Sequence, residues 1–206
     1  AQLVAIHDPE LLDRREVLSA AMPGATVLLN TKAPPDRVWD SLPREVQERL
    51  IERKCRLFAI DAYAVAEGAG LGRRINTVMQ ACFFELSRVI PVEEALGHVR
   101  RSIEESWGKR GPEIVRRNVA ALDAAIAAMR EIPIPATASA TRRRLPAVPE
   151  HAPDFVKKVT RLLAEGRGDE LPVSAFPPRR DLADRHEPLR EARHRARRPG
   201  LEAGDL

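Results

Sequence analysis

Residues 1–62 alternate short apolar runs with longer amphipathic stretches, and this alternation limits the fold more than any other feature of the chain. The apolar runs have the character of strands, whereas the amphipathic stretches have helical spacing. Strands that alternate with helices pair in one sheet, and the helices pack against its faces. We therefore predict an α/β fold, a layered sheet with amphipathic helices, in this order: strand 3–6, helix 9–22, strand 25–29, helix 35–54 and strand 56–60.

Three further helices are expected after residue 75. The first has Asn76 or Thr77 as its N-cap, because a side-chain oxygen there can accept a hydrogen bond from a free backbone amide. Its apolar residues follow helical spacing: Val78, Met79, Cys82, Phe83 and Leu86. The next two helices each combine one apolar stripe with a charged face. The stripes are Ala95, Leu96, Val99, Ile103 and Trp107, then Ile114, Val115, Val119, Leu122, Ile126 and Met129.

The composition is that of a globular protein, since 44% of the 206 residues are hydrophobic. No apolar run approaches the roughly 20 residues that cross a bilayer, and no signal-type segment opens the chain. We expect a cytoplasmic protein without a membrane partner. The two cysteines, Cys55 and Cys82, lack metal-ligand spacing, so buried, reduced thiols are expected. An iron–sulfur cluster needs about four thiolates, so this chain is not expected to hold one by itself.

The formal net charge of +4 makes nucleic-acid binding a competing class. Half of that charge lies in residues 179–206, which contain eight Arg against six acidic residues. The remaining 26 basic and 24 acidic residues are spread over residues 1–178. A net charge of +2 over that length does not make a basic face, so we expect no nucleic-acid partner.

From residue 132 to 153 the chain is rich in Pro, Ala, Ser and Thr around Arg142, Arg143 and Arg144, and it has no sustained period. Such a composition is typical of a linker. A helix is expected over residues 154–165, because Gly166 and Gly168 follow it directly. We divide the chain into a first domain, a linker, the start of a small following domain and a tail: residues 1–132, 133–150, 151–178 and 179–206.

Five sequence blocks, in order and spacing, resemble the third domain of pyruvate:ferredoxin (flavodoxin) oxidoreductases. This domain corresponds to the separate gamma subunit of multi-subunit 2-oxoacid oxidoreductases. The blocks are residues 25–30, 38–43, 58–62, 72–87 and 171–178. The resemblance implies a gamma-type domain over residues 1–132. It also implies that the first part of this domain is missing, with an unpaired sheet edge, and that residues 151–178 begin the small domain named for a Glu-Lys-Arg motif.

The resembled enzymes use thiamine diphosphate and iron–sulfur clusters to convert pyruvate, a 2-oxo acid, and coenzyme A to acetyl-CoA, and their electrons pass to ferredoxin or flavodoxin. These cofactors bind in other regions of the family, so we expect no cofactor and no catalytic residue in this chain, and no turnover by the chain alone. The expected partners are the remaining domains or subunits of the enzyme, which is a homo-oligomer. The gamma-type domain is implied to help hold coenzyme A and to pack between the larger domains.

Three residues are predicted contacts for coenzyme A under this resemblance: Asn30, Arg74 and Asn76. Asn30 ends a strand and Asn76 starts a helix, and polar ligands are commonly bound at such ends. Arg74, with its neighbour Arg73, could reach a phosphate. The structural alternatives are a turn residue for Asn30, a helix cap for Asn76 and a solvated pair for the two arginines.

Other motifs favour structural roles. The glycines at 68, 70 and 72 resemble a dinucleotide loop, but Arg73 occupies the third glycine position of that fingerprint, so a turn that ends a helix is favoured. Asp61 follows a strand and is interpreted as a capping or structural carboxylate. The histidines are too scattered along the chain for a metal site.

Residues 179–206 match nothing in the resembled family. Deleting one C from the codons after Pro177, with permitted synonymous codons, gives a family-like continuation that contains the Glu-Lys-Arg motif. Our hypothesis is that these residues are translated out of frame and form a disordered tail. The alternative to an enzyme fragment is a stand-alone protein-interaction module, although a free-standing domain rarely begins inside a sheet.

Overall fold

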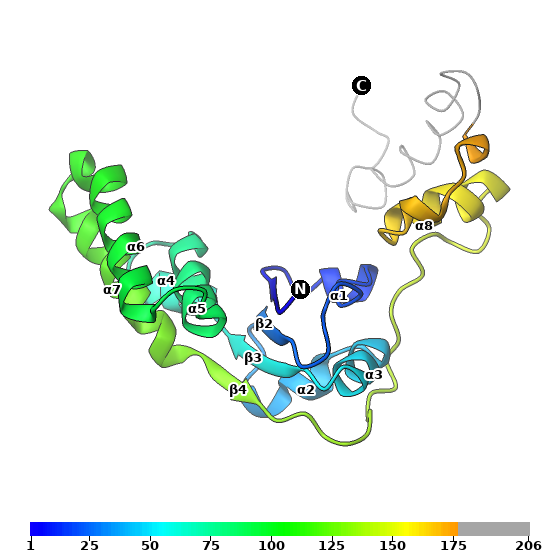
Figure 1. Cartoon of the computed structure of the whole chain (residues 1–206), viewed down its shortest axis with the longest axis horizontal. Coiled ribbons are helices and arrows are strands. Elements are labelled where there is room, and N and C mark those ends of the chain that lie inside the picture. Colours follow the sequence, from blue (N-terminus) through cyan, green and yellow to red (C-terminus); the bar gives the residue numbers. More distant parts are fainter. Residues whose placement is uncertain (177–206) are drawn as a thin grey trace, which may run out of the picture. The chain divides into compact units, whose positions relative to one another are not determined.

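A four-stranded sheet organises the first part of the chain (Figure 1). Its strands are β1 (Leu3–Ile6), β2 (Thr26–Asn30), β3 (Arg56–Ile60) and β4 (Arg130–Ile132). The first three run parallel in sequence order, and β4 pairs antiparallel with β3. The predicted α/β fold is confirmed, as are the three predicted strands, of which the second is displaced by one residue. β4 falls where a helix was expected to give way to a linker.

The computed structural model describes residues 1–176. The chain divides into unit 1, Ala1–Ala147, and unit 2, which begins at Val148. The domain boundaries expected from the sequence remain predictions, because unit 1 extends into the stretch that was expected to be a linker. The tail from residue 179 onward lies outside the described residues, and so does the prediction that it is disordered.

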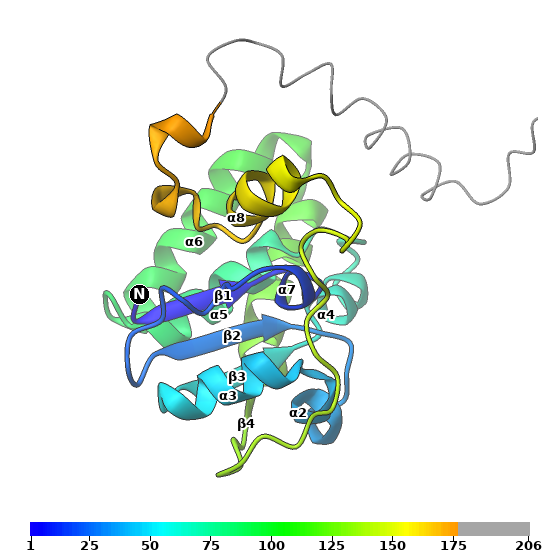
Figure 2. The same ribbon diagram turned by 90° about the vertical axis from the view of Figure 1, so that its right-hand side faces the viewer.

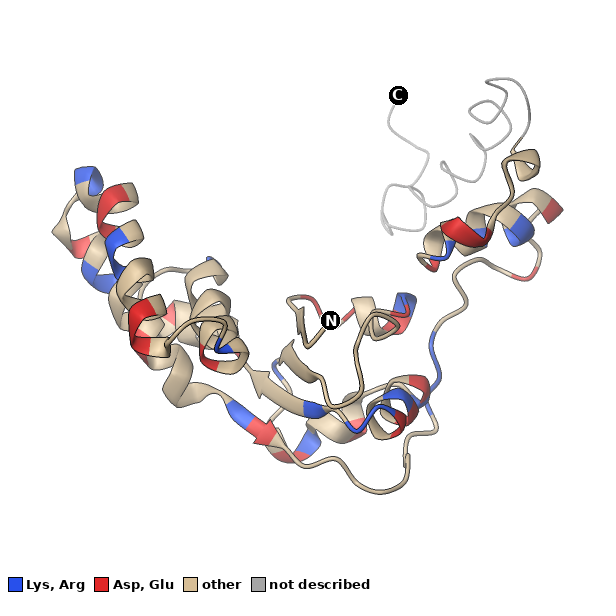
Figure 3. Cartoon of the chain, in the orientation of Figure 1, with Lys and Arg blue, Asp and Glu red and all other residues tan. Residues whose placement is uncertain are grey.

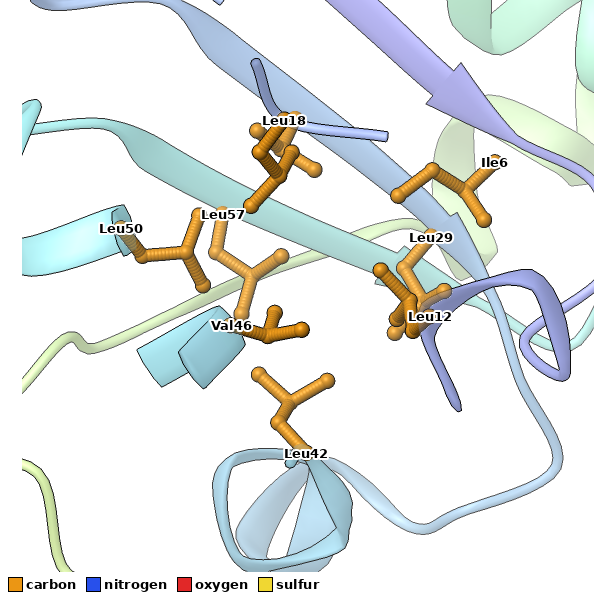
Figure 4. A pocket seen from close by; sticks show the side chains of 9 residues that line it. Ile6, Leu12, Leu18, Leu29, Leu42, Val46, Leu50 and Leu57 are labelled. Carbon is orange, nitrogen blue, oxygen red and sulfur yellow. The ribbon is translucent and has the colours of Figure 1, made fainter. Parts of the chain in front are cut away.

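Helices α1 (Leu11–Arg14), α2 (Val38–Ser41) and α3 (Arg44–Glu52) cover one face of the sheet, with the short 3-10 helix η1 (Pro35–Arg37) before α2. They lie in the two crossovers that join the parallel strands (Figure 2). Nine aliphatic side chains meet between the sheet and these helices and leave no space for a water molecule (Figure 4): Ile6, Leu12, Leu18, Val27, Leu29, Leu42, Val46, Leu50 and Leu57. This layer is core and not a ligand site.

Two predicted helices are longer than those in the structure. The prediction for residues 9–22 is wrong beyond Arg14, because Arg15 takes an extended conformation and ends α1. The prediction of one continuous helix over residues 35–54 is wrong. The helix is interrupted at Leu42, which is extended, with φ −80° and ψ 143°. Pro43 disfavours a helical residue before it and has no amide to donate, so α2 and α3 are separate helices.

Helices α4 (Ala62–Gly68), α5 (Asn76–Ser87), α6 (Val92–Trp107) and α7 (Pro112–Ala128) form a second core with the other face of the sheet; the 3-10 helix η2 (Gly108–Arg110) links the last two. The apolar stripe expected for α6 is confirmed. In α7 the buried positions include Ala121 and Ala125, and these small side chains let α5 approach closely. In α5, Phe83 was expected on the apolar face but is 36% exposed.

Residues 139–145, which we call the strap, are fastened to unit 1. The side chain of Gln47 in α3 is fully buried, and its Oε1 accepts hydrogen bonds from the amides of Ser139 and Ala140, both at 2.9 Å. Its Nε2 donates to the carbonyl of Trp39 at 2.7 Å. Three consecutive arginines of the strap pair with three carboxylates, as Arg142–Asp13, Arg143–Glu45 and Arg144–Glu16. Within the stretch expected to be a linker, the strap is therefore a bound part of unit 1.

Unit 2 contains a helical stretch that includes the π-helical residues Val156–Thr160 (η3) and α8 (Arg161–Ala164). The helix predicted for residues 154–165 is confirmed, and it ends as expected at Gly166, whose φ of 78° suits glycine. Two short 3-10 helices follow, η4 (Gly168–Glu170) and η5 (Val173–Ala175). None of the described helices of the chain has both the length and the apolar character to cross a bilayer.

Candidate functional site

The carboxyl ends of β1, β2 and β3 meet at one edge of the sheet because the three strands are parallel. Ligands of open α/β sheets commonly bind outside this edge. Three polar residues stand there: His7 directly after β1, Asn30 at the end of β2 and Asp61 directly after β3. A ligand site is therefore expected at this carboxyl edge.

Asn30 connects two strand ends. Its Nδ2 donates to the carbonyl of His7 at 2.9 Å, and its Oδ1 accepts from the amide of Ala62 at 3.0 Å. The residue is 1% exposed, so both ends of the side-chain amide are bound inside the protein. A buried amide with partners at both ends gains little from turning to a ligand. The geometry gives Asn30 the role of positioning the loops after β1 and β3, and its predicted contact with coenzyme A stays a prediction.

Asp61 caps α4, as expected from the sequence. Its Oδ1 accepts a hydrogen bond from the amide of Ala64 at 2.9 Å, and this bond satisfies one of the free amides at the start of the helix. Asp61 is also one of the residues that line a pocket at the carboxyl edge. Its first role is to hold α4 in place at the carboxyl edge.

A pocket of about 260 Å³ opens at the carboxyl edge, between the loop after β2, the end of β3, α4 and the junction of α7 with β4. Its lining residues are Thr31, Lys32, Ala33, Pro34, Pro35, Val38, Ala59, Ile60, Asp61, Ala64, Val65, Ala128 and Arg130. Lys32 is exposed and is not ion-paired with any residue in the described range. Arg130 is bonded through Nη1 to the carbonyls of Ala127 and Met129, at 2.5 and 2.8 Å. The pocket thus combines mostly small apolar walls with two cationic residues and one acidic residue, Asp61.

The turn between α4 and α5 carries the other two candidates. Asn76 is the first residue of α5 and is exposed, and the N-cap position is Ile75, which makes no side-chain cap. The hydroxyl of Thr77 donates instead to Oδ1 of Asn118 in α7, at 3.2 Å. The prediction that Asn76 or Thr77 caps this helix is therefore wrong, because α5 begins at Asn76 and both residues lie inside the helix, past the N-cap position.

The glycine-rich stretch before α5 is a turn that ends a helix, as expected. α4 ends at Gly68, and Gly70 and Gly72 have φ values of 72° and 60°, a region that side chains rarely adopt. A Cβ at position 70 would also lie 3.2 Å from Cδ of Arg117. This turn places Arg73 over the ring of Tyr63 and Arg74 over the ring of Trp107.

The three predicted coenzyme A contacts do not meet at one point. None of Asn30, Arg74 and Asn76 is among the lining residues of the carboxyl-edge pocket. Sequence reasoning missed the two cations of that pocket, Lys32 and Arg130. Lys32 follows Asn30 by two positions, so a search for polar residues after each strand could have found it. Arg130 could not be found in this way, because β4 was not expected.

The two cysteines are structural. Both are free and buried, as expected. Burial raises the pKa of the Cys82 thiol to about 12 and also raises the pKa of Cys55. Thiols that stay protonated are poor nucleophiles and poor metal ligands. Within the range that the structure describes, no three side chains of His, Cys, Asp and Glu are grouped as a metal site would require.

Two protein-family models match the sequence. The model described as pyruvate ferredoxin/flavodoxin oxidoreductase matches residues 1–128. A second model, EKR, described as a domain of unknown function, matches residues 141–186. The first match covers more than half of the chain and includes the whole carboxyl edge apart from β4.

Several curated proteins are similar to the chain over most of its length. The pyruvate-flavodoxin oxidoreductase of Rhodospirillum rubrum is 42% identical over 177 residues, and the pyruvate:ferredoxin oxidoreductase of Moorella thermoacetica is 37% identical over 178 residues. Both matches cover 86% of this chain, whereas the chain spans 15% of the length of each relative. Among solved structures, the PORC subunit of pyruvate oxidoreductase from Thermotoga maritima gives a TM-score of 0.49 at 18% identity, over 63% of this chain and 64% of that one.

Proposed function

The chain belongs to the pyruvate ferredoxin/flavodoxin oxidoreductase family, and we propose that it acts as the part of such an enzyme that faces coenzyme A. The resemblance expected from the five sequence blocks is thereby confirmed. In the whole enzyme, pyruvate would be oxidatively decarboxylated to acetyl-CoA, and the electrons would leave to ferredoxin or flavodoxin. The chain spans 15% of its relatives' length. We propose that this activity belongs to an assembly with the remaining domains, and that the assembly is a cytoplasmic homo-oligomer.

The pocket at the carboxyl edge carries the proposal. Coenzyme A combines phosphate groups with a long, mostly neutral arm, so it calls for cations beside a small apolar surface. Lys32 and Arg130 supply the cations, and residues such as Ala33 and Pro34 supply the apolar walls. Clefts that bury drug-sized ligands have volumes of about 300–1,000 Å³. At about 260 Å³ this pocket fits one part of coenzyme A, and the rest of the site falls to other domains.

Asn30 holds the strand ends beside this pocket in place. Its two hydrogen bonds fix the ends of β1 and β3, from which the loops beside the pocket begin. Arg74 lies on the turn before α5 and Asn76 is the first residue of that helix; both are exposed and outside the pocket lining. Asn76 remains a proposed contact for a part of coenzyme A that extends beyond the pocket, whereas the coenzyme A contact of Arg74 competes with the role inferred for it below. No residue of this chain is proposed to be catalytic.

Iron–sulfur clusters do not fit the residues of this chain. A cluster needs about four thiolates, and the two cysteines present are buried with raised pKa values. The clusters and thiamine diphosphate therefore belong to the remaining domains under this proposal. The purified chain is expected to show no pyruvate-dependent reduction of a viologen dye.

A hybrid enzyme tests the proposed function. Residues 1–178 of this chain replace the matching segment of the Rhodospirillum rubrum enzyme, with which the chain is 42% identical over 177 residues. The expected result is dye reduction that requires both pyruvate and coenzyme A. A hybrid that melts cooperatively at the temperature of the parent enzyme but has no coenzyme A-dependent turnover would contradict the proposal. The parent enzyme, expressed and assayed in the same way, is the control.

We also propose that the tail from residue 179 onward is translated out of frame. The matches to curated relatives cover 86% of the chain, which agrees with a continuation unrelated to theirs, although the EKR model matches as far as residue 186. Resequencing the gene across the codons of Pro177 and Pro178 tests this. An intact frame without a run of C at this point would remove the idea and leave the function of residues 1–176 unaffected.

A further inference from the structure

Three exposed arginines of unit 1 stack on two aromatic rings. The guanidinium carbon of Arg73 lies 5.2 Å from the ring centroid of Tyr63. The corresponding carbons of Arg74 and Arg110 lie 5.6 and 4.9 Å from the ring centroid of Trp107. We call these five residues the arginine–aromatic surface. Tyr63 comes from α4, Arg73 and Arg74 from the turn between α4 and α5, Trp107 from the end of α6, and Arg110 from η2.

None of these three guanidinium groups is ion-paired with any residue from 1 to 176. Most other arginines in that range form an ion pair. Glu113, three positions after Arg110, is already bonded to Arg116 and Arg117, at 2.5 and 2.9 Å. The chain has 30 acidic residues, yet none in the described range forms an ion pair with these three neighbouring arginines. Their guanidinium groups are therefore available for a partner.

Stacking prepares these groups for binding. A guanidinium that lies over a ring keeps its in-plane N–H groups free and loses part of its rotational freedom. Arg74 is restrained further, because its Nε donates to the carbonyl of Leu71 at 3.2 Å. Guanidinium groups held in this way can bind carboxylates through two parallel hydrogen bonds.

The composition of the surface favours a protein partner. Trp, Tyr and Arg are the residues most enriched at the energetic centres of protein interfaces. Figure 3 shows acidic residues interleaved with basic ones along α6 and α7, whereas nucleic acid would call for a continuous basic face.

We propose that the arginine–aromatic surface docks an acidic segment of a protein partner, whose Asp and Glu carboxylates bond to Arg73, Arg74 and Arg110 around Trp107. This inference rests on the proposed function in one respect: it places the acidic segment in the remaining domains of the oxidoreductase. The chemistry of the contact depends on unit 1 alone.

A labelled peptide tests the surface in the full chain. Fluorescence anisotropy of a fluorescein-labelled decaglutamate peptide is expected to rise on titration at low salt, and sodium chloride near 1 M should abolish the rise, because the screening length is then about 3 Å. The double variant Arg74→Ala/Arg110→Ala should raise Kd about tenfold. The matched control is Arg15→Ala/Arg101→Ala, which removes two exposed arginines that also lack a carboxylate partner in the described range and should leave Kd within about twofold.

Three results would overturn the proposal: no binding at low salt, equal losses in the two double variants, or displacement of the peptide by coenzyme A more strongly than by sodium chloride at the same ionic strength. The last result would give Arg74 the coenzyme A role instead. Neither variant changes the pocket at the carboxyl edge. The peptide experiment and the hybrid enzyme can therefore fail independently.

Discussion

Replacing Gln47 by leucine tests the bond between the strap and unit 1. The side chain is 0% exposed, and its Oε1 is the acceptor for the amides of Ser139 and Ala140, both at 2.9 Å. Leucine has a similar volume but no polar atom, so both amides lose their acceptor without a large cavity being formed. We expect Gln47→Leu to lower the unfolding free energy of unit 1 by about 1–3 kcal/mol.

This magnitude follows from counting the groups that lose a partner. The buried N–H of Ala140 loses its acceptor, which costs about 1–3 kcal/mol. Ser139 is exposed, so its amide can bond to water and adds little. The carbonyl of Trp39 loses the Gln47 donor at 2.7 Å but keeps the amide of Leu42 at 3.1 Å, so it adds little. The loss also has a ceiling. If the strap detaches, its amides bond to water, and the total loss cannot exceed the free energy that holds the strap in place.

Two measurements distinguish a bound strap from a detached one. Urea unfolding, followed by the fluorescence of Trp39 in a Trp107→Phe background, gives the change in stability. Hydrogen exchange at Ser139 and Ala140 reports on the strap itself, and the Trp39 indole is a second reporter because its Nε1 donates to Oγ of Ser139 at 3.1 Å.

The matched control is Gln80→Leu, which changes an exposed glutamine of α5 and should alter stability by less than about 0.5 kcal/mol. Equal stability of the two variants, with unchanged exchange at the strap amides, would refute the reasoning.

Three further predictions concern unit 1. Asn30→Leu should lower stability in urea by about 1–3 kcal/mol, because the Ala62 amide loses its acceptor; an unchanged midpoint would contradict this. Cys55 and Cys82 should resist a thiol reagent at mildly alkaline pH until the chain unfolds, since burial raises both pKa values; labelling of the folded chain would show the opposite. Burial raises the pKa of Glu45, but this effect is outweighed. Hydrogen bonds from its own backbone and from the Arg144 amide, together with the charges of Arg143 and Arg144, leave the pKa below 4.5. Its contribution to holding the strap is present above pH 4.5 and lost as the pH falls through the lower value, so Glu45→Gln should reduce the acid-induced rise in strap exchange.

The strands could be predicted because short apolar runs leave a clear signal, and in β2 and β3 all but the first residue are buried. The bounds of the helices between these strands were harder to predict, because two of the helix ends are set by single residues. Arg15 turns extended and ends α1, and Pro43 separates α2 from α3. β4 has only three residues, two of them charged and exposed, so no period in the sequence could reveal it.

The candidate site could be predicted only in part, because none of Asn30, Arg74 and Asn76 lines the pocket. A block ending in Asn30 at the end of a strand pointed to the carboxyl edge of the sheet, where a pocket does lie. The bonds of Asn30 to His7 and Ala62 join segments far apart in the sequence, and no local pattern contains them. The strap was missed for the same reason, because Gln47 and Ser139 are 92 positions apart.

The most direct test of the central claim is the KM for coenzyme A of the hybrid enzyme with Lys32→Gln, measured beside Lys54→Gln. Lys32 lines the pocket, whereas Lys54 is an exposed lysine just before β3, at the opposite edge of the sheet. If the pocket faces coenzyme A, Lys32→Gln raises this KM roughly three- to tenfold through the loss of one charge-assisted contact, and Lys54→Gln does not. The KM for pyruvate stays unchanged in both. Equal coenzyme A KM values for the two variants and the unmodified hybrid would contradict the assignment of this edge.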